Sequence, residues 1–163
     1  MKVIFLDKDG VLNSDEFFDR TDKQNSEGAE LDVDIEKVKL LKEALDATGA
    51  NVVVTASARY TRGGQALMQL LRNNQIFASL TQLIGNERGI EIKRWLSEHP
   101  DTEDYVILDD EIFDSYDEEL MSKLIKISNG NGMNFGEGLL QKDIDEIIQR
   151  LGRKRQRDEE ERY

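Results

Sequence analysis

Carboxylate side chains follow directly after two of the short apolar runs in this sequence. The stretch "FLDKDG" places Asp7 and Asp9 behind one run, and "YVILDD" places Asp109 and Asp110 behind another. Carboxylates that lie close together repel one another and raise each other's pKa, and a divalent cation relieves that repulsion. A set of carboxylate oxygens suits a hard ion such as Mg²⁺. The pattern therefore predicts a Mg²⁺ site with these four residues as candidate ligands.

The pair Asp7 and Asp9 also suits covalent catalysis of phosphoryl transfer. A carboxylate at the end of a strand can attack phosphorus and form an aspartyl-phosphate, which assigns the nucleophile to Asp7. Asp9 can protonate the leaving oxygen and later deprotonate the water that hydrolyses the intermediate. A single aspartate at a strand end is usually a helix cap or a turn residue. That alternative explains neither "DxD" after one run nor "DD" after the other.

A third apolar run, "VVV" at residues 52–54, leads into Thr55 and Ser57, with Arg59 close behind. Ligands of doubly wound sheets bind outside the carboxyl ends of the strands, which brings these side chains to the same edge as the carboxylates. A metal ion together with a phosphate explains why a hydroxyl and a cation accompany four carboxylates. We therefore expect a phosphate-binding metal centre at one edge of a sheet.

The elements that position these residues alternate between strands and helices. Apolar runs rich in β-branched residues predict strands buried on both faces, at residues 3–6, 52–54, 105–108 and 124–128, with a weaker strand at 80–85. Apolar periods and end signals predict helices from Asp34 to Gly49 and at residues 65–71, 89–100 and 140–151. This alternation predicts an α/β fold with a mostly parallel central sheet.

The length of 163 residues predicts one domain, which we assign to residues 1–151, followed by a charged, solvated tail at residues 152–163. Residues 13–31 are polar and lack a clear period, so we expect a loop or flap there. Two aromatic residues inside it, Phe17 and Phe18, are expected to fold back on the core rather than stack on a substrate.

Composition excludes several classes of function. The formal net charge of −12 argues against broad, non-specific binding to nucleic acid, although a local basic site stays open. The chain has no cysteine, which excludes disulfides, zinc–thiolate sites and a cysteine nucleophile. No segment approaches the roughly 20 apolar residues of a membrane helix, and no signal peptide is visible. We expect a cytoplasmic protein and leave its oligomeric state open.

At these motifs the sequence resembles the haloacid dehalogenase (HAD) superfamily of aspartate-nucleophile phosphatases. "FLDKDGVLN" is similar to the first motif of that superfamily, "VVVTAS" to the second and "YVILDD" to the fourth. The resemblance implies a Rossmann-like three-layer αβα sandwich. It also implies that Thr55, with Ala56 beside it, binds the phosphate and that the acidic pair holds Mg²⁺. Which residue of that pair, Asp109 or Asp110, ligates the metal directly stays open.

The third motif of the superfamily is a Lys or Arg at the start of a helix. "NERGIEIKRWL" offers Arg88 at the helix start and Lys93 one turn later. Arg88 is the first choice, because the N-terminal end of a helix attracts anions and a guanidinium matches phosphate oxygens. Lys93 is the second choice. Asp114 either supports the metal through a ligand or forms a turn.

A narrower resemblance is to the small capless phosphatase domains of multifunctional RNA-repair proteins, and it extends to about Leu140. It is based on "VVVTASAR" and "RGIEIKRWLSEHPDTEDYVILDD". The segments between the motifs are too short for a cap domain, and an open site suits bulky phosphate carriers such as polynucleotide ends. Nucleotides and other small phosphomonoesters remain open as substrates.

The sequence therefore predicts a Mg²⁺-dependent phosphomonoester hydrolase that uses Asp7 as nucleophile and Asp9 as general acid and base. Two alternatives stay open. The first is a catalytically silent binding domain that keeps the fold, although such a domain is expected to lack at least one motif residue. The second is a phosphotransferase or mutase that passes the aspartyl-phosphate to another acceptor.

Overall fold

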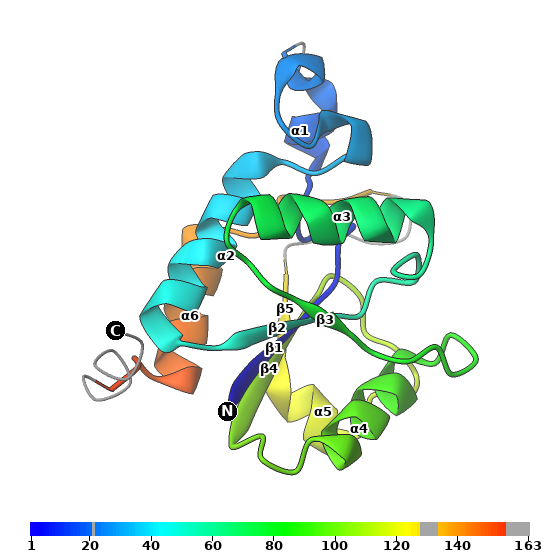
Figure 1. Ribbon diagram of the computed structural model, residues 1–163, viewed down its shortest axis with the longest axis vertical. Coiled ribbons are helices and arrows are strands. Elements are labelled where there is room, and N and C mark those ends of the chain that lie inside the picture. Colours follow the sequence, from blue (N-terminus) through cyan, green and yellow to red (C-terminus); the bar gives the residue numbers. More distant parts are fainter. Residues whose placement is uncertain (21, 128–133, 156–163) are drawn as a thin grey trace.

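A five-stranded, fully parallel sheet forms the centre of the protein in the computed structural model, which describes residues 1–20, 22–127 and 134–155 (Figure 1). The strand order is β3-β2-β1-β4-β5. The strands are β1 (Lys2–Leu6), β2 (Asn51–Val54), β3 (Ser79–Leu80), β4 (Asp104–Asp109) and β5 (Leu124–Lys126). This architecture confirms the predicted α/β class with its parallel sheet.

Helices cover both faces of the sheet. The α-helices are α1 (Asp15–Asp19), α2 (Ile35–Thr48), α3 (Arg62–Asn73), α4 (Arg88–Glu98), α5 (Glu118–Lys123) and α6 (Gln141–Leu151). Helices α2, α3 and α6 lie on one face, and α4 and α5 lie on the other (Figure 1). Their apolar side chains belong to two separate core clusters, one on each face. The protein is therefore a three-layer αβα sandwich. In the described ranges, the residues that separate β1 from β4 in the sequence form no second sheet, as expected for a domain without a cap.

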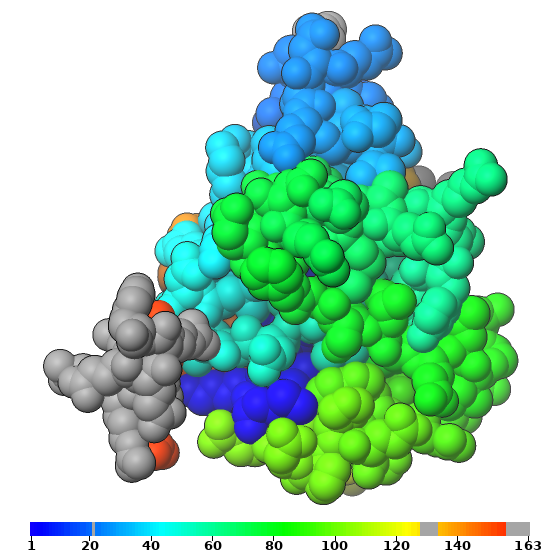
Figure 2. Space-filling view, viewed as in Figure 1, coloured from blue at the N-terminus to red at the C-terminus, as the bar shows by residue number. Residues whose placement is uncertain are grey.

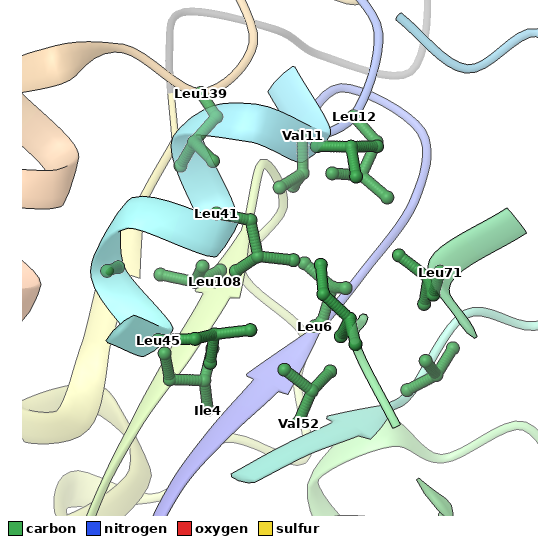
Figure 3. Packing of buried hydrophobic residues seen from close by; sticks show 14 of the residues in the cluster. Ile4, Leu6, Val11, Leu12, Leu41, Leu45, Val52, Leu71, Leu108 and Leu139 are labelled. Atoms are coloured by element: carbon green, nitrogen blue, oxygen red, sulfur yellow. The ribbon is translucent and has the colours of Figure 1, made fainter. Parts of the chain in front are cut away.

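Successive side chains of β1 point into the two opposite layers. Ile4 and Leu6 pack with Leu41 on the face covered by α2 (Figure 3), whereas Phe5 lies edge-to-face against Trp95 of α4 at 5.4 Å between ring centroids. Burial on both faces explains why the strand reads as an unbroken apolar run. Truncation of a buried ring such as Phe5 to alanine removes about 3–5 kcal/mol of stability.

The predicted limits of α2 are confirmed. The Asp34 side chain accepts a hydrogen bond from the backbone N–H of Glu36 at 3.1 Å, and Gly49 ends the helix with a φ of 73°. The helix predicted at residues 65–71 is the centre of the longer α3, which begins after Thr61. The Thr61 hydroxyl accepts from the backbone N–H of Gly64 at 3.3 Å, so a hydroxyl cap starts the helix in a glycine-containing stretch.

The prediction of a strand over residues 80–85 was wrong beyond Leu80. Only Ser79 and Leu80 pair with β2. The chain then leaves the sheet, because the carbonyl groups of Thr81 and Gln82 accept hydrogen bonds from the buried guanidinium of Arg59. The short helix α5 was not predicted at all.

The predicted flap at residues 13–31 contains more structure than a loop. It holds α1 and two 3-10 helices, Lys23–Asn25 and Ala29–Leu31, and it stands at the top of the view in Figure 1. Phe17 is buried, as predicted, whereas Phe18 is half-buried against Phe135 at 4.9 Å between ring centroids.

Most of the charged tail that begins at residue 152 lies outside the described residues. Within the part of the chain that the structure describes, no helix has the length and apolar character needed to cross a membrane.

Candidate active site

The ends of β1, β2 and β4 bring the motif residues to one edge of the sheet. The register places Leu6 level with both Val54 and Leu108, so the residues that follow them are neighbours. The Asp7 N–H donates to the Leu108 carbonyl at 3.1 Å, and the Thr55 N–H donates to the Leu6 carbonyl at 2.8 Å. Parallel pairing thus continues one residue past the strands and fixes the backbone of the site.

A cavity of about 380 Å³ opens at this edge. Five of the residues predicted for the site line it, namely Asp7, Asp9, Ala56, Arg88 and Asp110. Thr55 and Asp109 are fully buried next to the cavity, and both contact Arg88. The structure therefore brings together the side chains that follow the three apolar runs.

Three carboxylates form a compact group that fits a divalent cation. Asp7, Asp109 and Asp110 each offer an oxygen within 4.8 Å of the others. When all three carboxylates are ionised, Arg88 neutralises one of the three negative charges. One Mg²⁺ balances the two negative charges that remain. An all-oxygen donor set of this kind suits that ion. Among the described residues, three of the four candidate ligands bring their carboxylates together, and the side chain of Asp9 is not part of the group.

Gly10 gives Asp110 the space that it occupies. A Cβ atom at Gly10 would lie 2.1 Å from Oδ2 of Asp110, and the φ of Gly10 is +78°. Both the close approach and the left-handed backbone require glycine at this position. The arrangement of the carboxylate group therefore depends on the glycine of the "DKDG" stretch as well as on the aspartates.

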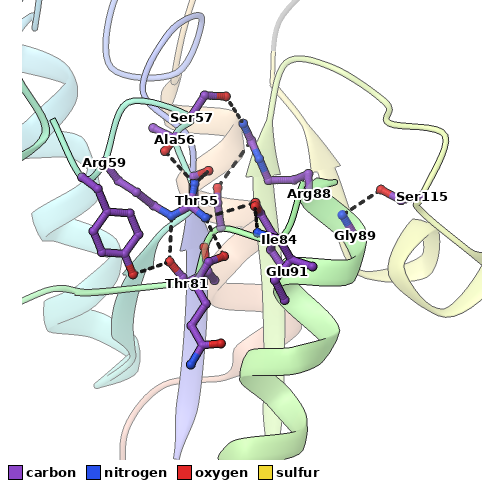
Figure 4. Close-up of polar contacts among 12 residues, drawn as sticks. Thr55, Ala56, Ser57, Arg59, Thr81, Ile84, Arg88, Gly89, Glu91 and Ser115 are labelled. Carbon is purple, nitrogen blue, oxygen red and sulfur yellow. Dashed lines mark hydrogen bonds and ion pairs between the residues drawn. The ribbon is translucent and has the colours of Figure 1, made fainter. Parts of the chain in front are cut away.

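Arg88, the first residue of α4, brings a positive charge into contact with two of the three clustered carboxylates. Its Nη1 lies 2.6 Å from Asp109, 3.5 Å from Asp7 and 3.5 Å from the Thr55 hydroxyl. Its Nη2 lies 3.5 Å from the hydroxyl of Ser57, a contact visible in Figure 4. Its guanidinium carbon also lies 4.6 Å from the ring centroid of Phe113.

Lys93, the second candidate for this role, points elsewhere. It is exposed, forms ion pairs with Asp117 and Glu119, and does not line the cavity. Asp114 is also exposed, and it lies outside both the cavity lining and the carboxylate group within the described residues. Of the predicted cations, the structure places Arg88 alone next to the carboxylates.

The pKa values of all three clustered carboxylates are raised. Burial, together with the neighbouring charge of Asp109, raises the pKa of Asp7 well above its usual value and that of Asp110 to about 7. Burial also raises the pKa of Asp109, although Arg88 opposes that shift. A bound cation would favour the ionised forms, so these shifts indicate a site short of positive charge.

Asp9 differs from the other aspartates because it is exposed and held by a neighbour. The Asn13 side chain donates to Asp9 Oδ1 at 3.1 Å and to the Asp32 carbonyl at 2.9 Å, and its own oxygen accepts from the Gly10 N–H at 2.8 Å. Asn13 is fully buried. It thus positions Asp9 and was missed by the sequence reasoning, although it lies four residues after Asp9 in the same motif.

The loop after β2 is fixed by Arg59, whose side chain is almost completely buried. Arg59 donates to the carbonyl groups of Thr55 and Ala56, at 3.2 and 3.0 Å, and also to two carbonyl groups of the loop after β3 (Figure 4). Its carboxylate partner is Glu91 of α4. The expectation that Arg59 would serve as a cation at the phosphate-binding edge was therefore wrong, because backbone carbonyl groups and Glu91 occupy its guanidinium. These carbonyl acceptors leave no mark in the sequence.

The N-terminal turn of α4 is held next to the site by Ser115. The Ser115 hydroxyl accepts from the Gly89 N–H at 2.8 Å (Figure 4). A Cβ atom at Gly89 would lie 2.2 Å from the Ser115 carbonyl oxygen, so only glycine allows this close approach. The contact sets the position of the neighbouring Arg88.

Residues 3–135 match the family model described as the HAD domain in Swiss Army Knife RNA repair proteins. The match spans all four motif stretches and the whole cavity lining. Comparisons with curated proteins and with solved structures found no match.

Proposed function

We propose that this chain, which belongs to the family of HAD domains in Swiss Army Knife RNA repair proteins, is a Mg²⁺-dependent phosphatase that acts through Asp7. The observation that carries the proposal is the group of three carboxylates with one arginine at the carboxyl ends of the strands. A HAD domain supports a phosphatase-type activity in general. The metal, the intermediate and the substrate are our inference from the side chains.

The first step transfers the phosphoryl group to Asp7. An oxygen of the Asp7 carboxylate attacks phosphorus, the ester P–O bond breaks, and the alcohol leaves with a proton supplied by Asp9. In the second step, a water attacks the aspartyl-phosphate and gives its proton to Asp9. Inorganic phosphate leaves and the Asp7 carboxylate is restored. The exposed position of Asp9, held by Asn13, gives it access to both the alcohol and the water.

Arg88 and the loop after β2 bind the phosphate in this proposal. The Arg88 guanidinium and the Ser57 hydroxyl face the cavity beside Asp7, so they can hold phosphoryl oxygens while the bond to phosphorus changes. Asp7 and Asp110 line the cavity and would ligate the ion directly, whereas Asp109 is fully buried and paired with Arg88. When bound, Mg²⁺ would supply positive charge to the phosphoryl oxygens and keep Asp7 ionised.

A phosphorylated polynucleotide end is the substrate class that we favour. The cavity has no cap domain above it among the described residues, which suits a bulky phosphate carrier. The family description also refers to RNA repair proteins. Nucleotides and other phosphomonoesters fit the same chemistry.

Phosphate release from a generic aryl phosphate tests the proposal. Wild type, Asp7→Asn and the control Asp114→Asn are compared with Mg²⁺ and with a chelator. We expect Mg²⁺-dependent release that is lost in folded Asp7→Asn and kept in the control, because Asp114 lies outside the carboxylate group. Equal activity of wild type and Asp7→Asn would show that Asp7 is not the nucleophile. Transfer to added alcohols in place of release would indicate a phosphotransferase.

A further inference from the structure

One long segment of this acidic chain contains no acidic residue. The sequence has 34 Asp and Glu among 163 residues, yet residues 47–86 contain neither. Its cations are Arg59, Arg62 and Arg72. The segment includes β2, the loop after β2, α3 and β3. No side chain of this segment therefore adds negative charge to the surface.

The outer face of α3 carries a polar stripe within that segment. Arg62, Gln65, Gln69 and Arg72 are spaced by three, four and three residues, which places them on one side of the helix, and all four are exposed. Ten residues of helix separate the two arginines by about 15 Å along the axis, enough to run beside several phosphates of a strand. Neither arginine forms an ion pair with a described residue.

A groove of about 280 Å³ runs beside this stripe. Gln65, Gln69 and Arg72 line one side of it, and Tyr60 and Leu80 contribute to the rest. The surface of α3 occupies the middle of the face seen in Figure 2. Tyr60 is 49% exposed, and its hydroxyl donates to the Thr81 carbonyl at 2.8 Å, so an open aromatic ring is held in a fixed position.

The catalytic cavity and the groove are lined by successive residues of the same loop. Ser57 and Ala58 line the cavity, and Tyr60, two residues later, lines the groove. The same loop therefore borders both sites. A chain whose terminal phosphate lies beside Asp7 can continue over this loop onto α3.

We propose that the groove along α3 binds the single-stranded polynucleotide that continues from the phosphorylated end, with backbone phosphates beside Arg62 and Arg72 and a base on Tyr60. The inference rests on the proposed function, because the terminal phosphate must enter the catalytic cavity. Two unpaired arginines, uncharged amides and an exposed ring are the groups that bind a flexible strand without reading its sequence. The acidic remainder of the protein repels a strand elsewhere, which confines it to this path.

The double variant Arg62→Gln/Arg72→Gln tests the groove. Its matched control, Arg94→Gln/Arg153→Gln, removes the same charge from two exposed arginines outside the acid-free segment. The substrates are an aryl phosphate and single-stranded oligonucleotides of about ten nucleotides with a phosphate at either end. We expect the groove variant to keep wild-type hydrolysis of the aryl phosphate and to raise KM for the oligonucleotide about tenfold. The affinity of the groove variant for the oligonucleotide should also depend less on salt. The slope of log affinity against log salt concentration should become less negative by about 0.7 for each lost phosphate contact.

Binding of a fluorescent oligonucleotide to Asp7→Asn, with and without the groove substitutions, separates this inference from the proposed function. Weaker oligonucleotide binding in the groove variant supports the groove, whether or not wild type is active. If wild type releases no phosphate from any ester, only the proposed function is refuted. An unchanged KM and unchanged binding in the groove variant would refute the groove. Polyglutamate of equal length serves as a competitor. If it displaces the fluorescent probe as effectively as unlabelled oligonucleotide does, the surface binds an acidic protein and the inference is overturned.

Discussion

Arg59 and Glu91 form an ion pair of 3.1 Å in which the two side chains keep only 1% and 2% of their surface exposed. The remaining N–H groups of Arg59 donate to backbone carbonyl groups, and the second carboxylate oxygen of Glu91 accepts from the Ile84 N–H at 2.9 Å. The pair therefore joins the loop after β2, the loop after β3 and α4. These are the segments that hold Thr55 and Arg88 at the site.

Removal of one partner of this pair should destabilise the protein strongly. Arg59→Met or Glu91→Leu leaves an unpaired buried charge, which costs about 3–5 kcal/mol of unfolding free energy. The double variant Arg59→Met/Glu91→Leu should lose less than the sum of the two single variants, because no charge is left alone. Chemical denaturation measures all three values.

The exposed pair of Arg94 and Glu98 on the same helix provides the control. These side chains are 55% and 43% exposed at 3.9 Å, so Arg94→Met should change stability by less than about 1 kcal/mol. A loss in Arg59→Met as small as that in Arg94→Met would contradict the structural role of the buried pair.

Gly10→Ala should weaken Mg²⁺ binding as well as the fold. The new Cβ would overlap Oδ2 of Asp110, and alanine would be held at a φ of +78°. Gly85 is the matched control, since its φ is +60° and a Cβ there meets nothing within 4 Å. Both substitutions should cost about 1–2 kcal/mol for the left-handed backbone. Only Gly10→Ala should also reduce Mg²⁺ affinity, by about tenfold or more in calorimetric titration. Equal affinities in the two variants would show that Gly10 does not position Asp110.

Much of the candidate active site could be predicted from the sequence, because its residues follow directly after strands that apolar runs reveal. Apolar runs located β1, β2 and β4, and the edge of a parallel sheet then brought Asp7, Thr55 and Asp109 together. Short elements were harder, because α5 and the helices of the flap have too few residues to show a period. The strand expected at 80–85 failed for a different reason, since a buried arginine takes the carbonyl groups that a strand would use.

The directions in which side chains point could not be predicted from the sequence. Arg88 and Lys93 both lie on α4, and their five-residue separation turns them to different sides of the helix. Asp9 lies two residues after Asp7, yet the turn at Gly10 takes its side chain out of the carboxylate group and toward Asn13. Such directions depend on where a turn or helix starts, and a shift of one residue changes them.

Arg88 and Lys93 can be separated by activity. Arg88→Lys keeps a positive charge beside Asp109 but loses the planar fork that matches phosphate oxygens, so kcat should fall by about 10²–10³. Lys93→Ala should leave kcat within about twofold, because Lys93 is exposed and paired with Asp117 and Glu119. The assay is steady-state hydrolysis of an aryl phosphate, with thermal unfolding to verify the fold. A large loss in Lys93→Ala alone would reverse the assignment.

Mg²⁺ should stabilise the protein more at about pH 8 than at about pH 5. In the metal-free protein, burial and Asp109 raise the pKa of Asp110 from 3.8 to about 7. A raised carboxyl pKa means that the folded state binds the proton more tightly than the unfolded state. The stability from that proton is complete below about pH 4 and is lost as the pH rises through about 7. A divalent cation replaces the proton, so it acts most where the carboxylates are ionised.

Thermal unfolding with Mg²⁺ and with a chelator, at both pH values, measures this effect. We expect the Mg²⁺-induced rise in Tm to be larger at the higher pH in wild type. It should be small at both pH values in Asp110→Asn, which removes a ligand and a titrating group together. Asp114→Asn should behave like wild type, because that exposed carboxylate lies outside the group. A Tm shift of the same size at both pH values in wild type would show that protons and Mg²⁺ do not compete for these carboxylates.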